Sequence, residues 1–266
     1  MLITSTSNPR IKQIRKLLDR KERQKTGLFY IEGVRIVTEA IHSDWEIEYL
    51  IYSKDLIKSE FGTELVRSAL EREMNVVEVS PDVFKYLSLK DGPQGIAAVL
   101  KQKQKTIAEL VLNKGDLWVA LDSVADPGNL GTILRTCDAV GARGVILLDH
   151  STDPYDPSVV RASMGAFFSQ QMISITSEMF NRWSKENQVV IIGTSDKAGK
   201  RYNELTYPDS FILLMGSERE GLSPRLISEC NELVSIPMVG KSDSLNLAVA
   251  TGIVLYEIFN QKQLNQ

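Results

Sequence analysis

Five polar side chains occur in three short stretches of this chain, and each stretch follows an apolar run. The stretch "DPGNLGTILR" (126–135) contains Asn129 and Arg135, "GSEREG" (216–221) contains Glu218, and "SDSLN" (242–246) contains Ser244 and Asn246. Together they offer a carboxylate, a guanidinium, a hydroxyl and two amides, which are hydrogen-bond donors and acceptors suited to orienting a polar substrate. Whether they can act together depends on the elements that position them.

Each stretch also has a simpler interpretation. "DPGN" is a good turn in which Asn129 could only cap a helix, and the charges of "GSEREG" could face water. Ser242, Asp243 or Ser244 could cap the last helix. No stretch matches the dinucleotide pattern GxGxxG or the phosphate-loop pattern GxxxxGK[ST], so the sequence supports neither a nicotinamide cofactor nor ATP.

The elements around these stretches form a regular α/β pattern. We expect strands at 117–121, 144–148, 189–193, 211–215 and 233–236, with helices between them and a last helix over 246–261. Near-continuous apolar strands alternating with helices predict a parallel sheet covered on both faces. Ligands bind beyond the carboxyl ends of such strands, and all three stretches begin there.

The first 100 residues predict a smaller α/β domain. Ser7 or Asn8 is a natural cap for a helix that begins at Pro9, and a second helix is expected from about 33 to 41. Strands are expected at 47–53, 75–80 and 95–100. The polar stretch 101–115 reads as a linker, and the second domain is predicted to run from 116 to 266.

Charge is unevenly distributed. The net charge is −3, yet residues 1–35 contain nine basic and three acidic side chains. A basic arm on an acidic body suggests a polyanionic partner, although a solvated helix face is the alternative.

The remaining composition excludes several classes of protein. Among the 266 residues, 43% are hydrophobic and 24% charged, as in ordinary globular proteins. No apolar run approaches the ~20 residues needed to span a bilayer, and the N-terminus lacks an apolar signal core. Two distant cysteines and two histidines predict no disulfide and no zinc site. We therefore expect a cytoplasmic protein whose cysteines are buried.

Taken together and in order, the three stretches resemble the motifs of the SpoU/TrmH branch of the SPOUT methyltransferases. The resemblance covers Asn129 with Arg135, "MGSEREGLSP" and "IPMVGKSDSLNLAVATGIVLYE", across roughly 115–262. It extends more weakly through "SNPRIKQIRKL", "FYIEGVRIVTEA" and "GPQGIAAV", which look like the N-terminal substrate-binding domain of the family, an L30e-like RNA-binding fold.

The resemblance implies an S-adenosylmethionine (AdoMet)-dependent RNA ribose 2′-O-methyltransferase that needs no metal. It implies that the parallel sheet ends in a deep trefoil knot and that the protein is a homodimer. The implied catalytic residues are Asn129, Arg135, Glu218, Ser244 and Asn246. The implied AdoMet-binding residues are Thr194, Met215, Gly216, Ile236, Pro237, Met238 and Leu245.

Two roles follow from chemistry within that resemblance. A guanidinium does not readily lose a proton, so Arg135 is expected to hold the phosphate and ribose of the nucleotide. Glu218 is expected to pair with Arg135 or Arg219, and Arg219 is either an RNA contact or a solvated turn charge.

The basic arm would bind structured RNA through phosphates and shape, and the candidate contacts are Arg10, Arg15, Lys16, Arg20 and Arg35. Ribosomal (23S) RNA is the expected substrate, with transfer RNA as an alternative. A non-catalytic dimeric RNA-binding protein, and an enzyme acting on a small metabolite, are the other classes left open.

Overall fold

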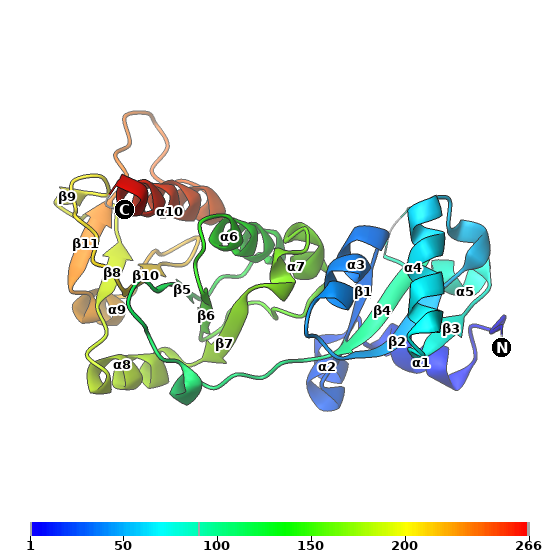
Figure 1. Cartoon of the computed structure of the whole chain (residues 1–266). Coiled ribbons are helices and arrows are strands. Elements are labelled where there is room, and N and C mark those ends of the chain that lie inside the picture. Colours follow the sequence, from blue (N-terminus) through cyan, green and yellow to red (C-terminus); the bar gives the residue numbers. More distant parts are fainter. Residues whose placement is uncertain (1, 90, 265–266) are drawn as a thin grey trace. The chain divides into compact units, whose positions relative to one another are not determined.

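The computed structural model describes residues 2–89 and 91–264. The chain divides into two compact units, both visible in Figure 1. The first unit contains the chain up to Lys103 together with Tyr155–Phe168, and the second contains Gln104–Pro154 and the chain from Ser169 onward. The segment 101–115, predicted as a linker, is partly packed, because Ile107 and Leu110 are buried in the core of the second unit. The segment Tyr155–Phe168 packs with the first unit although it lies between two strands of the second.

The first unit is built on a four-stranded sheet with the order β1-β4-β2-β3. Its strands are β1 (Leu28–Glu32), β4 (Ile96–Lys101), β2 (Ile47–Tyr52) and β3 (Val76–Glu78). β4 is antiparallel to β1 and β2, and β2 is parallel to β3. The sequence pattern does not predict β1, because its last four residues are all buried and the alternation that marks a half-exposed strand is absent.

Short helices cover this sheet. The helices are α1 (Pro9–Lys16), α2 (Arg20–Thr26), α3 (Val34–His42), α4 (Glu60–Glu71), α5 (Pro81–Leu87) and, from the inserted segment, α7 (Pro157–Ala162). Asn8, rather than Ser7, caps α1 by accepting a hydrogen bond from the main-chain N–H of Arg10 at 2.9 Å. Ile11, Ile14 and Phe84 of α1 and α5 are buried in one core with Tyr30 of β1.

The second unit contains a seven-stranded sheet in which every pairing is parallel. Its strands, in spatial order, are β7 (Gln171–Ile175), β6 (Gly144–Leu148), β5 (Leu117–Asp122), β10 (Phe211–Met215), β8 (Ile191–Thr194), β11 (Glu232–Ser235) and β9 (Lys200–Arg201). The expected α/β fold with a parallel sheet is confirmed. The five expected strands are present within two residues of their predicted ends, and β7 and β9 were missed.

Helices cover both faces of the parallel sheet, as Figure 1 shows. On one side α6 (Pro127–Ala139) packs against α10 (Leu247–Leu264), and on the other lie α8 (Ser177–Glu186) and α9 (Pro224–Glu229). Phe180, Trp183 and Leu226 from α8 and α9 are buried against the sheet in one core cluster. The trefoil knot stays a prediction.

No helix within residues 2–89 and 91–264 is long and apolar enough to cross a membrane.

Candidate active site

The three motif stretches meet at one edge of the parallel sheet. Chain order runs outward from β5 through β6 to β7, whereas β10 and β8 lie on the opposite side of β5. The strand order therefore reverses between β5 and β10, which is where ligands bind in open parallel sheets. Asp126–Arg135 follows β5, residues 216–221 follow β10, and residues 236–246 follow β11.

Helix α6 presents Asn129 in its first turn. Asp126 is the N-cap, and its Oδ1 accepts a hydrogen bond from the main-chain N–H of Asn129 at 2.7 Å. Pro127 follows at the first helical position, where its missing N–H costs nothing. The interpretation of Asn129 as only a cap is therefore wrong, because Asp126 has that role and the Asn129 amide is left for other contacts.

The turn after β10 brings Glu218 to that amide. Ser217 and Gly221 exchange main-chain hydrogen bonds of 3.1 and 3.2 Å, and Gly221 has a φ of 67° that favours glycine. A Cβ on Gly216 would lie 2.2 Å from the main chain of Gly221, so only glycine fits where the turn folds back. The Oε1 of Glu218 then accepts a hydrogen bond from Nδ2 of Asn129 at 3.0 Å.

Glu218 also accepts a hydrogen bond from the main-chain N–H of Ala125 at 3.3 Å. It makes no ion pair with Arg135 or Arg219 within the described chain, so the expected pairing is wrong. The carboxylate instead accepts from neutral donors, the main chain just before α6 and the Asn129 side chain in its first turn.

Asn246 completes the arrangement from the third stretch. Its Nδ2 donates to Oδ1 of Asn129 at 2.9 Å, and its own Oδ1 accepts from the main-chain N–H groups of Ala248 and Val249 at 2.9 and 3.3 Å. Asn246 thus caps α10, a role that sequence analysis gave to Ser242, Asp243 or Ser244. Glu218, Asn129 and Asn246 form one hydrogen-bonded row, which we call the Glu218–Asn129–Asn246 relay.

The relay has a fixed direction. An ionised carboxylate only accepts hydrogen bonds, so Glu218 requires the NH₂ group of Asn129 and turns the Asn129 oxygen toward Asn246. A flip of the Asn129 amide would therefore break its hydrogen bonds to both Glu218 and Asn246.

Arg135 and Ser244 lie outside the relay. Both are exposed, and the described chain offers neither side chain a hydrogen bond or ion pair. Arg219 is exposed as well. These groups are therefore available to a substrate.

The predicted cofactor residues lie at the neighbouring strand ends. Oγ1 of Thr194, the last residue of β8, donates to Sδ of Met215, the last residue of β10, at 3.6 Å. Met238 and Leu245 are 39% and 37% exposed, although their side chains are apolar. In Figure 1 the segment between β11 and α10 is the orange loop that projects from the second unit.

The main-chain N–H and C=O groups of that loop lack hydrogen-bond partners among the described residues. Within the described chain, residues 236–245 make no main-chain hydrogen bond, so their N–H and C=O groups are open to water or a ligand. Apolar side chains beside free main-chain donors and acceptors suit a flat heteroaromatic group such as adenine. The residues present therefore fit AdoMet.

Asp122, which was not among the predicted site residues, ends β5 beside the first motif. Burial raises the pKa of Asp122, the negative charges of Asp149 and Glu220 raise it further, and a hydrogen bond from Ser123 opposes them. An aspartate that ends an apolar strand was the available signal. In the described part of the chain, no group of three or more His, Cys, Asp or Glu side chains could hold a metal ion.

Both parts of the chain match known families. The model of the SpoU rRNA Methylase family matches residues 116–256, and that of the MRM3-like substrate binding domain matches residues 8–98. A 23S rRNA (guanosine(2553)-2′-O)-methyltransferase of Bacillus subtilis is 32% identical, over 96% of this chain and 98% of its own length.

Solved structures are similar over nearly the whole chain. An AdoMet-bound rRNA methyltransferase of Sinorhizobium meliloti is 36% identical with a TM-score of 0.89, covering 98% of this chain and 97% of that one. The SpoU methyltransferase AviRb of Streptomyces viridochromogenes, in complex with AdoMet, is 30% identical with a TM-score of 0.88, covering 96% and 98%. With the relay at the carboxyl edge of its sheet and both family models matched, the chain belongs to the SpoU rRNA methylase family.

Proposed function

We propose that this protein transfers a methyl group from AdoMet to a ribose 2′-OH of 23S ribosomal RNA. The observation that carries the proposal is the Glu218–Asn129–Asn246 relay, which joins three distant motifs, while the exposed guanidinium of Arg135 lies on the same helix α6 as Asn129. A relative similar over nearly the full length of both chains is a 23S rRNA 2′-O-methyltransferase, which supports this reaction and this class of RNA.

The cofactor is proposed to lie across the ends of β8, β10 and β11. Thr194, Met215 and Gly216 form its floor, and the loop with Ile236, Pro237, Met238 and Leu245 surrounds it. When bound, AdoMet supplies a methyl group on a positively charged sulfonium. The half-buried Glu218 carboxylate places a negative charge on this side of the sheet, which favours a cationic ligand.

The chain itself aligns the ribose and manages its proton. Transfer to a 2′-OH requires the oxygen to be held in line with the methyl group while its proton is lost. Arg135 is proposed to hold the phosphate and ribose through its planar fork, because a guanidinium stays protonated in proteins and therefore cannot accept the proton of the 2′-OH. Ser244, exposed and next to Leu245, offers a hydroxyl that can accept or donate at the ribose.

The relay is proposed to act through position. The Asn129 amide donates a hydrogen bond to Glu218 and accepts one from Asn246, so it holds the start of α6 against the start of α10. Arg135 lies further along α6, so the position of its side chain depends on where that contact holds the helix.

The first unit is proposed to bind the RNA through its basic arm. Arg10, Lys16, Arg20 and Arg35 are exposed, as phosphate contacts must be. Arg15 is half-buried, donates to the carbonyl of Leu87 at 3.2 Å and lies 5.3 Å from the centre of the Tyr86 ring, so it also has a structural role.

The proposal includes a homodimer and a knotted second unit. Residues 247–256 of helix α10 are almost all apolar, yet Val249 and Tyr256, seven residues apart on one face, are 52% and 49% exposed. A second copy would cover that face. The position of β10 between β5 and β8 supports the trefoil knot, because the chain returns to the middle of the sheet after the strands on both sides of β10 have been formed from earlier residues. Because the proposed substrate is ribosomal RNA, we also propose that the protein is cytoplasmic.

Methyl transfer from labelled AdoMet tests the reaction. Free RNA and isolated ribosomal subunits from cells lacking this protein would be incubated with the wild type, Arg135→Lys and, as a matched control, Arg225→Lys, with methylated positions mapped by resistance to alkaline cleavage. We expect one new site in 23S rRNA and a loss of at least about 100-fold in kcat for Arg135→Lys, because lysine lacks the fork.

Arg225 is exposed on α9, so its replacement should leave turnover unchanged. Methylation of transfer RNA alone would replace the proposed substrate and keep the chemistry. Wild-type turnover in Arg135→Lys would remove the proposed role of Arg135. AdoMet binding without incorporation into any RNA would contradict the proposed activity.

A further inference from the structure

Helices α1 and α5 pack against each other and form a surface that is mostly basic. Helix α1 has four basic residues and no acidic one, and α5 has one of each sign. The exposed side chains of Lys12, Lys16 and Lys85 make no ion pair among the described residues. We call the exposed part of these helices, residues 10–16 and 82–86, the α1–α5 face. Its positive charge favours a polyanionic ligand.

Tyr86 is a large side chain that α5 leaves in water on this face. It is 42% exposed, and the guanidinium of Arg15 lies 5.3 Å from the centre of its ring. The positive charge of the guanidinium is attracted to the electron-rich face of the ring, and this contact limits how the ring can turn. An exposed aromatic ring beside an arginine is a surface on which a nucleic-acid base can stack.

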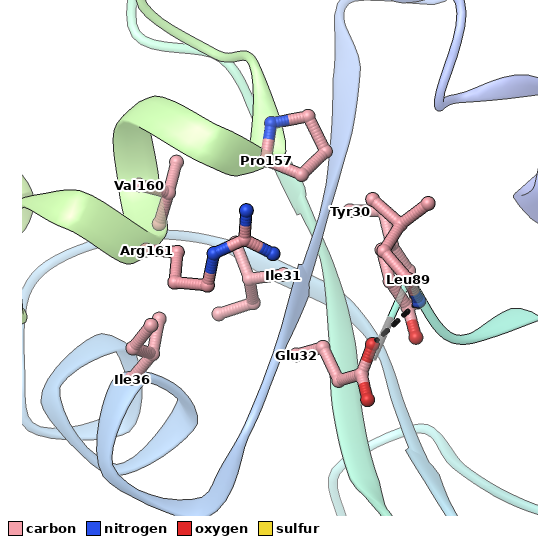
Figure 2. Close-up of a pocket in the computed structure, with 8 residues that line it drawn as sticks. All are labelled: Tyr30, Ile31, Glu32, Ile36, Leu89, Pro157, Val160 and Arg161. Carbon is pink, nitrogen blue, oxygen red and sulfur yellow. Dashed lines mark hydrogen bonds between the residues drawn. The ribbon is translucent and has the colours of Figure 1, made fainter. Parts of the chain in front are cut away.

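The end of α5 holds Arg15 in place. Nη1 of Arg15 donates to the carbonyls of Leu87 and Ser88, at 3.2 and 3.5 Å. The segment after α5 is anchored in turn by Glu32, which accepts from Oγ of Ser88 at 2.7 Å and from the main-chain N–H of Leu89 at 3.2 Å. Figure 2 shows the second of these hydrogen bonds. The arginine is therefore positioned before a ligand arrives, which lowers the entropy cost of binding.

A second arginine of α1 also contacts a tyrosine ring. The guanidinium of Arg10 lies 5.2 Å from the centre of the Tyr49 ring, although Tyr49 is half-buried on β2. Helix α4 of the same unit offers a contrast, because its Phe61 is 56% exposed but the helix has three glutamates and only one arginine. An exposed ring among positive charges thus distinguishes the α1–α5 face from α4.

We propose that the α1–α5 face binds an unpaired segment of the substrate RNA, with one base stacked on the ring of Tyr86. The lysines of this face contact the phosphates, and Arg15 holds the ring. Bases inside a duplex are stacked on one another, so this site needs an unpaired nucleotide. Stacking tolerates any base, because every base has a π-face. This inference rests on the proposed RNA-binding role of the first unit and adds the kind of RNA that this face takes.

Fluorescence anisotropy of labelled oligonucleotides tests the proposal without methyl transfer. The probes are a single strand of about ten uridylates and an abasic ribose-phosphate chain of the same length, each titrated with the full chain at one low salt concentration. Tyr86→Ala and Tyr86→Leu, which both remove the ring, should weaken binding of the uridylate strand about tenfold, because one stacked base is lost. Tyr86→Phe keeps the ring and should bind like the wild type.

The abasic chain separates stacking from charge. It offers only phosphates and sugars, so neither Tyr86→Ala nor Tyr86→Leu should change its affinity. The double variant Lys12→Ala with Lys16→Ala should weaken binding of both probes to a similar degree. Phe61→Ala is the matched control for the loss of an exposed aromatic side chain, and it should leave binding of both probes unchanged.

Four results would each overturn the proposal. They are unchanged binding of the uridylate strand by Tyr86→Leu, an equal loss with the abasic chain, an equal loss in Phe61→Ala, and a wild type that does not bind the uridylate strand. Labelled methyl transfer by the same preparation shows whether the proposed reaction fails as well or stands without this site.

Discussion

Asn129 uses both ends of its amide inside the protein, although it lies at the mouth of the proposed active site. Its NH₂ group meets a carboxylate and its oxygen meets an amide NH₂, so each partner determines the orientation of the other. A loss at any position of the relay should therefore affect the same geometry, and the three residues should behave as a unit rather than additively.

Asn246→Asp separates the two roles of Asn246. Aspartate caps a helix about as well as asparagine, so the free energy of unfolding should change by less than about 0.5 kcal/mol. The donor to Asn129 is lost, so kcat for methyl transfer should fall about 10- to 100-fold. Urea unfolding and steady-state kinetics check the two parts. A large loss of stability with normal kcat would make Asn246 a cap and nothing more.

Asp122 predicts a pH dependence of stability. Its pKa is raised in the folded protein, first by burial, so the fold disfavours the ionised form. Above the folded pKa this lowers the free energy of unfolding, and the effect disappears as pH falls toward the ordinary aspartate pKa of ~3.9. Asp122→Asn should therefore be more stable than the wild type at pH 7, with the difference shrinking near pH 4. Thermal unfolding at both pH values measures it, and a constant difference would exclude this cause.

At the scale of elements, most basic residues of the arm lie in the two short helices α1 and α2, and these residues have different roles. Arg23 of α2 is 1% exposed, and its guanidinium donates to the carbonyls of Leu17 and Leu18 at 2.9 Å, where α1 ends. One of the nine basic residues thus serves the fold rather than RNA. Burial distinguishes it from Arg20, three residues earlier and exposed.

Arg23→Met should lower the free energy of unfolding by about 3 kcal/mol, because it leaves two carbonyls and Asp156 without their donor. Arg20→Ala is the matched control and should leave stability unchanged while weakening RNA binding. Chemical denaturation and RNA binding at fixed salt would be measured for both variants. Equal stability of the two would show that the Arg23 contacts contribute little.

At the scale of the whole molecule, the apolar face of α10 is one surface that a single chain leaves exposed. Tyr256→Arg places a charge on this face and should convert the proposed dimer to a monomer at micromolar concentration. Light scattering after size exclusion gives the mass directly. A variant that stays dimeric would put the contact on another surface, and a monomeric wild type would contradict the dimer itself.

The sequence determined the main elements and the identity of the motif residues. The apolar strands of the second unit were predictable because strands buried on both faces leave near-continuous hydrophobic runs. β7 (Gln171–Ile175) was missed, because the polar, exposed residues Gln171 and Ser174 interrupt the apolar run. That Asn129, Glu218 and Asn246 lie near one another followed from their places at strand ends.

Only the tertiary structure decided which of these side chains touch and which unit a segment joins. Glu218 accepts hydrogen bonds from Asn129 and the main chain of Ala125 rather than pairing with an arginine, and α7 packs with the first unit. Both outcomes depend on contacts between residues some 90 or more apart in the chain. Local propensity carries no information about such contacts. Packing and hydrogen-bond satisfaction across the whole chain decide them.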